Sequence, residues 1–417
     1  MNEVKLGDVA DVRISGVDKK TLPNEIPVRL CNYTDVYYNW TIRTENRQKF
    51  MLASAKEDEI SKFRLHAGQV ALTKDSETKF DIGHSTFISE DFEDVILGYH
   101  CALISPHPGM LDGQYLNAMF RTRHISDYLA RNAGGSGQRY YLSEAAIKSI
   151  PLKLPPITTQ LRIAAILGSI DEKIELNRKK LAELEALAKT IYDYWFVQFD
   201  FPDKNGKPYK SSGGKMVWNE QLKREIPEGW EIGNLYDIAN FENGLACQKF
   251  RPKDNEASLP VIKIREMHDG INSDTERVSI NIPEKHRITD GDLLFSWSAS
   301  LEAMIWSGGV GGLNQHIFKV TPRGEYTVEY VYWQLKTYIV TFAKMAEARK
   351  TTMGHITADH IKQSRVILPI SEILSHFAAT IRPIFDNRID LKKEIRVLVE
   401  LRDTLLPLLM NGQVEVK

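Results

Sequence analysis

The sequence predicts an α+β protein with mixed α/β domains, in which two homologous globular domains are separated by two long helices. Three observations support this fold class. The chain repeats itself over about half its length. Each copy contains short β-type runs that alternate with helical patterns. Each copy then ends in a heptad pattern, which is typical of a coiled coil. We therefore expect the two helices to pack as an antiparallel coiled coil in a duplicated arrangement with pseudo-twofold symmetry.

The repeat is recognised by short matches that occur in the same order in both halves. One match would be chance, but a shared order with slowly drifting offsets indicates a duplication. The matched pairs are Lys5-Leu6-Gly7-Asp8 with Glu231-Ile232-Gly233-Asn234, Gly68–Leu72 with Gly291–Phe295, and His100–Pro106 with His316–Pro322.

The first part of each copy has the pattern of a compact α/β domain. Helical periodicity is found at Gln114–Tyr128 and Glu329–Ala346. Strands are predicted from apolar runs bounded by turn residues. These runs are Gln69–Leu72, Ala102–Ile104, Asp292–Phe295 and Ile317–Val320.

A long helix is predicted after the prolines that close each domain, Leu154-Pro155-Pro156 and Leu368-Pro369. Apolar residues recur at alternating steps of four and three from Ile163 to Trp195 and from Phe377 to Leu409. This spacing keeps one stripe facing a partner helix. At 1.5 Å per residue, a helix over residues 158–196 would be roughly 58 Å long, too long to bury its stripe on a small domain. The second long helix is therefore the expected partner.

Polar residues interrupt the two stripes at a few positions. Asn177 either fixes the register of the helices or is a tolerated polar residue near a helix end, and the sequence leaves both interpretations open. Arg388 and Arg402 make the second stripe less regular. The stripe residues that we expect to serve in helix pairing and partner docking are Leu181, Leu184, Ile191, Ile395, Leu398 and Leu405.

These patterns give five predicted segments. A Pro-, Gly- and Ser-rich stretch between the two copies has the composition of a mobile surface linker. The segments are a first globular domain over 1–156, a central helix over 157–197, the linker over 198–229, a second globular domain over 230–370 and a C-terminal helix over 371–417.

The composition limits the classes of protein to which the chain can belong. An apolar fraction of 42% is ordinary for a folded chain, and the 3 Cys residues include no C-x-x-C pair. The start of the chain has no apolar signal segment, and we expect a cytoplasmic protein without membrane contact. Because the formal net charge is −1, any DNA site must be a local patch or be shared with a partner.

Enzyme motifs are missing from the sequence. It contains neither a nucleotide-binding Gly motif nor the Pro-Pro-aromatic motif of amino-methyltransferases, and we expect no catalytic residue and no metal site. Glu77-Thr78-Lys79 matches the Glu-x-Lys pattern of metal-dependent nucleases only loosely, because it lies in a polar, turn-like stretch. His100 and His316 precede a strand in both copies, which indicates a shared structural hydrogen bond rather than a catalytic pair.

The order of these features resembles the specificity (S) subunit of type I restriction-modification enzymes. The residues that carry the resemblance are the two domain openings, Gly134-Gly135-Ser136-Gly137-Gln138, Leu154-Pro155-Pro156 before the long helix, and Pro227-Glu228-Gly229-Trp230 before the second copy. The second copy departs from the pattern, because Arg349–Gly354 stands in place of a Gly-Ser-Gly-Gln stretch and Leu368-Pro369 has lost one Pro.

The resemblance implies a non-catalytic subunit of a site-specific deoxyribonuclease and adenine methyltransferase complex. Each globular domain would read one half of a split, asymmetric target in double-stranded DNA, and the helices would set the spacer. The partners would be two methyltransferase (M) subunits and motor-nuclease (R) subunits. S-adenosylmethionine, ATP and Mg would belong to those partners and not to this chain.

The residues expected to contact DNA are loop residues that can donate to bases or phosphates. In the first domain they are Lys74, Ser76, Gln138, Arg139, Tyr140 and Tyr141. In the second domain they are Ser296, Trp297, Ser298, Arg349, Lys350, Thr351 and Thr352. We expect Trp297 to serve domain packing more than base stacking. The alternative function is a coiled-coil scaffold whose α/β domains bind protein or peptide.

Overall fold

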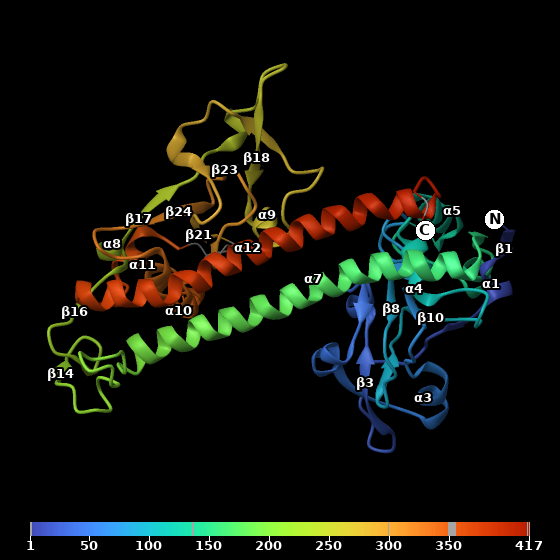
Figure 1. The fold of residues 1–417 in the computed structure, drawn as a ribbon, viewed down its shortest axis with the longest axis horizontal. Coiled ribbons are helices and arrows are strands. Elements are labelled where there is room, and N and C mark those ends of the chain that lie inside the picture. The colour runs from blue at the N-terminus through green and yellow to red at the C-terminus, as the bar shows by residue number, and fades with distance from the viewer. Residues whose placement is uncertain (1, 136, 299, 349–355, 415, 417) are drawn as a thin grey trace. The chain divides into compact units, whose positions relative to one another are not determined.

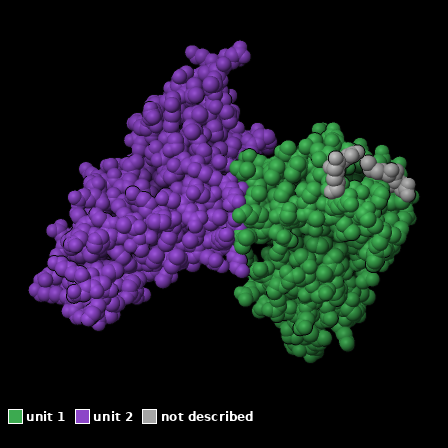
Figure 2. All heavy atoms as spheres, in the orientation of Figure 1, with its two compact units in different colours: residues 1–176, 397–417 green, residues 177–396 purple. Residues whose placement is uncertain are grey.

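The computed structural model describes residues 2–135, 137–298, 300–348, 356–414 and 416 (Figure 1). The chain forms two compact units (Figure 2). Unit 1 comprises residues 1–176 and 397–417, and unit 2 comprises residues 177–396. Each long helix therefore contributes one part to each unit, whereas the predicted segments had treated the helices as separate from the globular domains.

The described residues of unit 1 form four sheets and the helices that pack on them. The strands of the five-stranded sheet, in spatial order, are β2 (Ala10–Ile14), β10 (Cys101–Pro106), β6 (Val70–Thr73), β8 (Ser85–Ile88) and β4 (Thr41–Ile42). The other sheets are β5 (Met51–Ala55), β3 (Ile26–Cys31) and β9 (Val95–Leu97); β11 (Gly134–Gly135), β12 (Tyr140–Tyr141) and β7 (Asp75–Ser76); and β1 (Asn2–Lys5) with β13 (Pro151–Leu154). The short helices are α1 (Leu6–Val9), α2 (Tyr33–Tyr38), α3 (Glu57–Phe63), α4 (Gly113–Phe120), α5 (Arg123–Asn132) and α6 (Glu144–Lys148).

Unit 2 repeats part of this plan. Its strands are β17 (Ala239–Asn243), β24 (Ile317–Pro322), β21 (Leu293–Ser296) and β22 (Glu302–Ile305) in one sheet; β19 (Arg277–Ser279), β18 (Ser258–Ile262), β23 (Gly311–Leu313) and β20 (Arg287–Ile288) in another; and the pairs β16 (Glu231–Gly233) with β25 (Val366–Leu368) and β14 (Met216–Asn219) with β15 (Arg224–Pro227). Its short helices are α8 (Leu235–Ile238), α9 (Ile264–Asp269) and α11 (Ala358–Lys362), and the longer α10 spans Val328–Ala348.

The strand orders confirm the duplication that the sequence predicts. The order β2-β10-β6-β8 in unit 1 corresponds to β17-β24-β21-β22 in unit 2. In both units a central strand also has one antiparallel and one parallel neighbour: β3 lies between β5 and β9, and β18 lies between β19 and β23. A mixed pairing of this kind is unlikely to arise twice in the same sequence order without duplication.

The helix predicted over Gln114–Tyr128 is divided in the structure. Helix α4 begins where the Asp112 side chain accepts a hydrogen bond from the Tyr115 amide, 2.8 Å away, and it ends at Phe120. Thr122 takes an extended conformation and begins α5. A residue in the extended conformation that N-cap residues adopt interrupts the helix at this point. The pattern of apolar residues alone does not show such a break.

The two long helices are α7 (Ile157–Tyr192), which continues as a single π turn over Asp193–Val197, and α12 (Ser371–Met410). Their packing is antiparallel within unit 2, because Glu185 of α7 contacts Arg388 of α12 whereas the later Tyr192 lies beside the earlier Phe377. In unit 1, Ile163 and Leu167 of α7 share a core with Leu406 and Leu409 of α12.

The residues along the two stripes differ in burial. Ile163, Leu167, Phe377 and Ile381 are buried in the cores of their units. The six stripe residues predicted for docking, Leu181, Leu184, Ile191, Ile395, Leu398 and Leu405, are all half-buried. Asn177 is fully buried, and neither amide atom has a hydrogen-bond partner among the described residues, so this polar residue destabilises the stripe.

The segment 198–229 corrects the expectation of a mobile linker. Phe199 and Phe201 are buried in the core of unit 2, and the Phe201 ring stacks on Trp230 at 5.1 Å between ring centres. The hairpin β14–β15 completes the segment. The aromatic residues fold the polar stretch onto the domain, so its Gly, Pro and Ser residues form turns rather than a free connection.

None of the helices in the described part of the chain has the length and apolar content that crossing a bilayer requires.

Candidate nucleic-acid interface

The two loops of the first domain that were predicted to contact DNA lie together in unit 1. Strand β7 pairs with β12, with Tyr140 opposite Ser76 and Tyr141 opposite Asp75. Strand β12 also pairs with the glycines of β11, and the Leu142 amide donates to the Lys74 carbonyl at 2.7 Å. Predicted residues from separate parts of the sequence therefore form one small sheet. Whether they contact DNA stays a prediction.

Glycine is required at the turn that presents Arg139. Gly135 has a φ of 143°, and a Cβ there would collide with the Arg139 carbonyl oxygen. Gly137 has a φ of 90°, in the left-handed region that favours glycine. Local structure thus explains these glycines, because they allow the chain to reverse direction beside β12.

Asp75 is the centre of a charged cluster. Its Oδ2 lies 2.8 Å from Lys74 Nζ and 2.6 Å from His100 Nδ1. Arg139 Nη2 lies 4.0 Å from the same oxygen and 2.7 Å from His100 Nδ1. Burial by itself raises the pKa of the Asp75 carboxyl, but hydrogen bonds from Lys74 and His100 outweigh it and lower that pKa below its ordinary value. Asp75 is therefore an anion at neutral pH and holds three basic side chains around it.

This arrangement gives His100 a structural role, but His316 does not share it, because its Nδ1 has no hydrogen-bond partner among the described residues. His100 has a φ of 73°, which is uncommon for a side chain with a Cβ, and its carbonyl accepts a hydrogen bond from the Lys74 amide at 2.9 Å. Its Nδ1 donates to Asp75 Oδ2, which leaves Nε2, 3.2 Å from Arg139 Nη2, as the acceptor for the arginine. His100 thus connects the loop before β10 to both predicted DNA-contacting loops.

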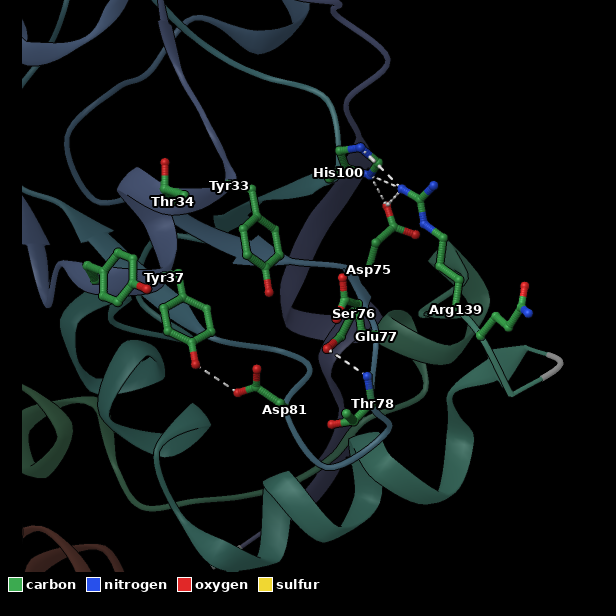
Figure 3. A pocket seen from close by; sticks show the side chains of 12 residues that line it. Tyr33, Thr34, Tyr37, Asp75, Ser76, Glu77, Thr78, Asp81, His100 and Arg139 are labelled. Carbon is green, nitrogen blue, oxygen red and sulfur yellow. Dashed lines mark hydrogen bonds and ion pairs between the residues drawn. The ribbon is translucent and has the colours of Figure 1, made fainter. Parts of the chain in front are cut away.

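The cluster forms one side of an open pocket of about 580 Å³. Figure 3 shows Asp75, His100 and Arg139 at one side of the pocket, and Tyr37 with Asp81 at the other. The Tyr37 hydroxyl donates to Asp81 Oδ1 at 2.9 Å. Burial, followed by this hydrogen bond, raises the pKa of Tyr37 to about 12, so the phenol stays protonated. The remaining lining residues are Tyr33, Thr34, Tyr38, Ser76, Glu77, Thr78 and Gln138.

The chemistry of this lining suits the edges of nucleic-acid bases. It contains donors, acceptors and aromatic faces on an exposed surface, the groups with which proteins read bases. Among the described residues no group of three His, Cys, Asp or Glu side chains is placed to hold a metal ion.

Three predicted residues of the first domain do not line the pocket. Tyr140 is half-buried and packs against the core of unit 1. Lys74 is largely buried and its ammonium group is already bound to Asp75, so it positions the cluster. Tyr141 is half exposed, and its ring lies against Gly134 of β11. Ser76, Gln138 and Arg139 line the pocket directly.

In the second domain the predicted residues have a different environment. Ser296 is fully buried, and its hydroxyl donates to the Ser300 carbonyl. Ser298 is also buried. Trp297 packs against Phe318, and its Nε1 donates to Asn243 Oδ1 at 3.2 Å, in accordance with the packing role expected for it. Arg349, Lys350, Thr351 and Thr352 lie outside the described residues. Among the described residues, unit 2 has no counterpart of the sheet formed by β11, β12 and β7.

The sequence reasoning missed the acidic and aromatic residues of the pocket. Asp75 and Glu77 alternate with the predicted Lys74 and Ser76, so their position beside predicted contacts was an available signal. Tyr33, Tyr37 and Tyr38 are far from these loops in the sequence, and only their close spacing on one short helix marked them.

Comparisons with known proteins show the family of the chain. The family described as type I restriction modification DNA specificity domain matches residues 1–186 and 227–401. The chain is 26% identical over 328 residues to the type I restriction enzyme MjaIX specificity subunit of Methanocaldococcus jannaschii, covering 75% of this chain and 72% of that protein. It is 23% identical over 394 residues to the HindI specificity subunit of Haemophilus influenzae, covering 81% of this chain and 85% of that protein.

A solved structure has a similar fold. The S subunit of the type I restriction-modification system from M. genitalium superposes with a TM-score of 0.56 at 15% identity, covering 98% of this chain and 95% of that one.

Proposed function

The chain belongs to the type I restriction-modification DNA specificity family, and from this premise we propose that it recognises a bipartite, asymmetric target in double-stranded DNA. Each homologous domain reads one half-site. Because the two domains carry different loop residues, the two half-sites differ in sequence. The specificity subunit of such a system is a non-catalytic component, and this role is consistent with a sequence that lacks enzyme motifs.

The observation that carries the proposal is the open pocket of unit 1. Two loops separated in sequence bring Ser76, Gln138 and Arg139 to the same exposed surface, beside the three tyrosines of α2. A protein that reads base pairs needs donors and acceptors held in fixed positions. The pairing of β7 with β12 and the contacts of Asp75 supply that rigidity in this domain.

The long helices serve, in this proposal, as the spacer between the two readers and as the dock for two M subunits, with R subunits joining for cleavage. Equivalent groove faces recur every 10–10.5 bp along a duplex, so stiffly linked readers require half-sites at a defined separation. Two linked readers also gain affinity through effective concentration. S-adenosylmethionine, ATP and Mg are assigned to the partner subunits.

Exchange of residues 1–156 for the corresponding domain of another family member tests the proposal. We expect one half-site of the methylated sequence to change while the other half-site and the spacer stay the same. Long-read sequencing of methylated adenines in cells that carry either gene measures this. A methylation pattern that is independent of the exchanged domain would contradict the proposal, as would binding of peptides but not of DNA by the complex with the methyltransferase.

Charged substitutions in the middle of the helix pair test the docking surface. Leu181 and Leu398 are half-buried, so Leu181→Glu and Leu398→Glu leave the fully buried core positions unchanged. We expect each to reduce co-purification with the methyltransferase by at least about tenfold, the effect of losing roughly 1.4 kcal/mol of binding. The matched control is Val340→Glu, at an exposed position of α10. Unchanged assembly in both stripe variants, with normal circular dichroism, would exclude this docking surface.

A further inference from the structure

Arg139 has hydrogen-bonding capacity that the protein itself does not use. Its side chain is 58% exposed, and its Nη2 is held by His100 and Asp75. Nε and Nη1 make no hydrogen bond within the described part of the chain, and Nη1 together with the second hydrogen of Nη2 can form the two-donor fork of arginine. An arginine held at one nitrogen by neighbouring side chains has less rotamer freedom to lose on binding, so its remaining donors are prepared for a ligand.

Glu77 supplies an acceptor in the same pocket. It lies next to β7, its side chain is exposed, and it has no hydrogen bond or ion pair among the described residues. The pocket therefore contains an unused arginine edge and an unused carboxylate. Arg139 does not require Glu77 as an ion-pair partner, because Asp75 and His100 already hold it.

The charge of the lining distinguishes between phosphate and base as the ligand. Of the three carboxylates around the pocket, Asp75 is paired with Lys74 and Asp81 contacts His84, whereas Glu77 has no ion pair among the described residues. A phosphate placed at Arg139 would lie beside the Glu77 carboxylate and be repelled by it. The edge of a base pair is uncharged, and it presents acceptors to arginine and amino groups to carboxylates.

We propose that this pocket reads a guanine·cytosine base pair in the major groove, with Arg139 donating to guanine O6 and N7 and Glu77 accepting from cytosine N4. The inference rests on the proposed function and adds to it the base identity at one position. Guanine is the base whose major-groove edge presents two acceptors to the arginine fork, and cytosine is its partner with an exposed amino donor. Asp75 and His100 act as positioning residues for Arg139.

The experiment uses the full chain in complex with its methyltransferase and a duplex that carries the mapped methylation target. Each guanine of the half-site that changes on exchange of residues 1–156 is replaced in turn by 7-deazaguanine, which lacks the N7 acceptor. We expect one replacement to weaken binding of the wild-type complex by about tenfold. This step needs no substitution in the protein, so a folding defect cannot affect it.

The variants Arg139→Ala and Glu77→Gln then assign the contact. We expect Arg139→Ala to lose about 5- to 150-fold in affinity for the target and to become insensitive to 7-deazaguanine at that position. Arg139→Lys keeps the charge without the fork and should lose selectivity for guanine as well. Glu77→Gln should relax the preference for cytosine on the opposite strand. The matched control is Arg123→Ala, at a surface arginine on α5, which should leave the selectivity unchanged.

Two outcomes would overturn the inference. Uniform weakening by Arg139→Ala on all duplexes, with a salt dependence reduced by about one counterion, would make Arg139 a phosphate contact. If the Arg139→Ala complex still responded to every 7-deazaguanine as the wild-type complex does, Arg139 would read no guanine. In both cases the proposed function survives if the complex still prefers its target. A wild-type complex without any preference for the target would overturn both.

Discussion

Replacing Glu185 by alanine is expected to lower the free energy of unfolding of unit 2 by about 3 kcal/mol. Glu185 lies on α7 and forms an ion pair with Arg388 of α12, whose side chain is 7% exposed. Removing one partner of a buried pair leaves an uncompensated charge, which destabilises by about 3–5 kcal/mol. We take the lower end because the Glu185 side chain is 33% exposed and water reaches it.

The surroundings of Arg388 explain why it depends on this one carboxylate. Its guanidinium lies over the rings of Phe385 and Tyr332, at 4.9 and 5.6 Å from the ring centres. Nε and Nη1 have no hydrogen-bond partner among the described residues. Burial lowers the pKa of Arg388 to about 10, so the guanidinium still carries its charge at neutral pH. The Tyr332 hydroxyl, 2.8 Å from Glu185 Oε1, would lose its acceptor as well.

Denaturant unfolding measured by tryptophan fluorescence would show the effect in unit 2. Of the 7 tryptophans in the chain, only Trp40 lies in unit 1. The exposed ion pair of Lys189 with Asp193 on the same stretch of chain provides the control, since Lys189→Ala should cost less than about 1 kcal/mol. The double variant Glu185→Leu with Arg388→Met should recover most of the lost stability, because apolar residues replace the buried pair. Equal effects of Glu185→Ala and Lys189→Ala would contradict the assignment of a buried ion pair.

The ion pair also shows which features of the fold could be predicted from the sequence and which could not. The heptad spacing predicted both long helices, because the periodicity of apolar residues is a local property. The same spacing made Arg388 look like an imperfection at the fourth position of the stripe, which Ile174 occupies in the first helix. Its partner Glu185 is distant in sequence and lies on the other helix. Only the antiparallel packing brings the two together, and periodicity contains no information on such a pair.

The segment 198–229 differs from its prediction for a similar reason. Its Gly, Pro and Ser residues are typical of a flexible connection, and composition is a property of the segment alone. Phe199 and Phe201 are nevertheless buried, because Trp230 offers them an aromatic surface. Two buried aromatic side chains outweigh the flexibility of the polar residues around them.

Part of the candidate site was predicted from the sequence. Local sequence properties marked some of its residues, whereas others depend on contacts between distant segments. Gln138 and Arg139 were found because Gly-rich loops with polar side chains are typical of DNA contacts. Asp75 was not, because its importance arises from the pairing of β7 with β12 and from its contact with His100. Pairing between distant strands depends on the tertiary fold, whereas loop composition does not.

Replacing Phe377 by alanine is expected to destabilise unit 2 by about 3–5 kcal/mol, a large part of the 5–15 kcal/mol that stabilises a typical domain. Phe377 is fully buried, and its ring centre lies 4.8 Å from that of Phe196 and 5.6 Å from that of Trp195. Truncation leaves a cavity lined by large rings, which cannot close it without breaking their own contacts. Tryptophan fluorescence reports directly on this site through Trp195.

The comparison with other positions on α12 makes this expectation specific. Val397 is 56% exposed, so Val397→Ala should change the free energy of unfolding by less than about 0.5 kcal/mol. Phe377→Leu keeps most of the apolar volume and should cost clearly less than Phe377→Ala. If Phe377→Ala and Val397→Ala had equal effects, the first stripe position of α12 would not be part of the core. The pairing of α7 with α12 in unit 2 would then lack the aromatic contact that Tyr192, Trp195 and Phe377 provide in this structure.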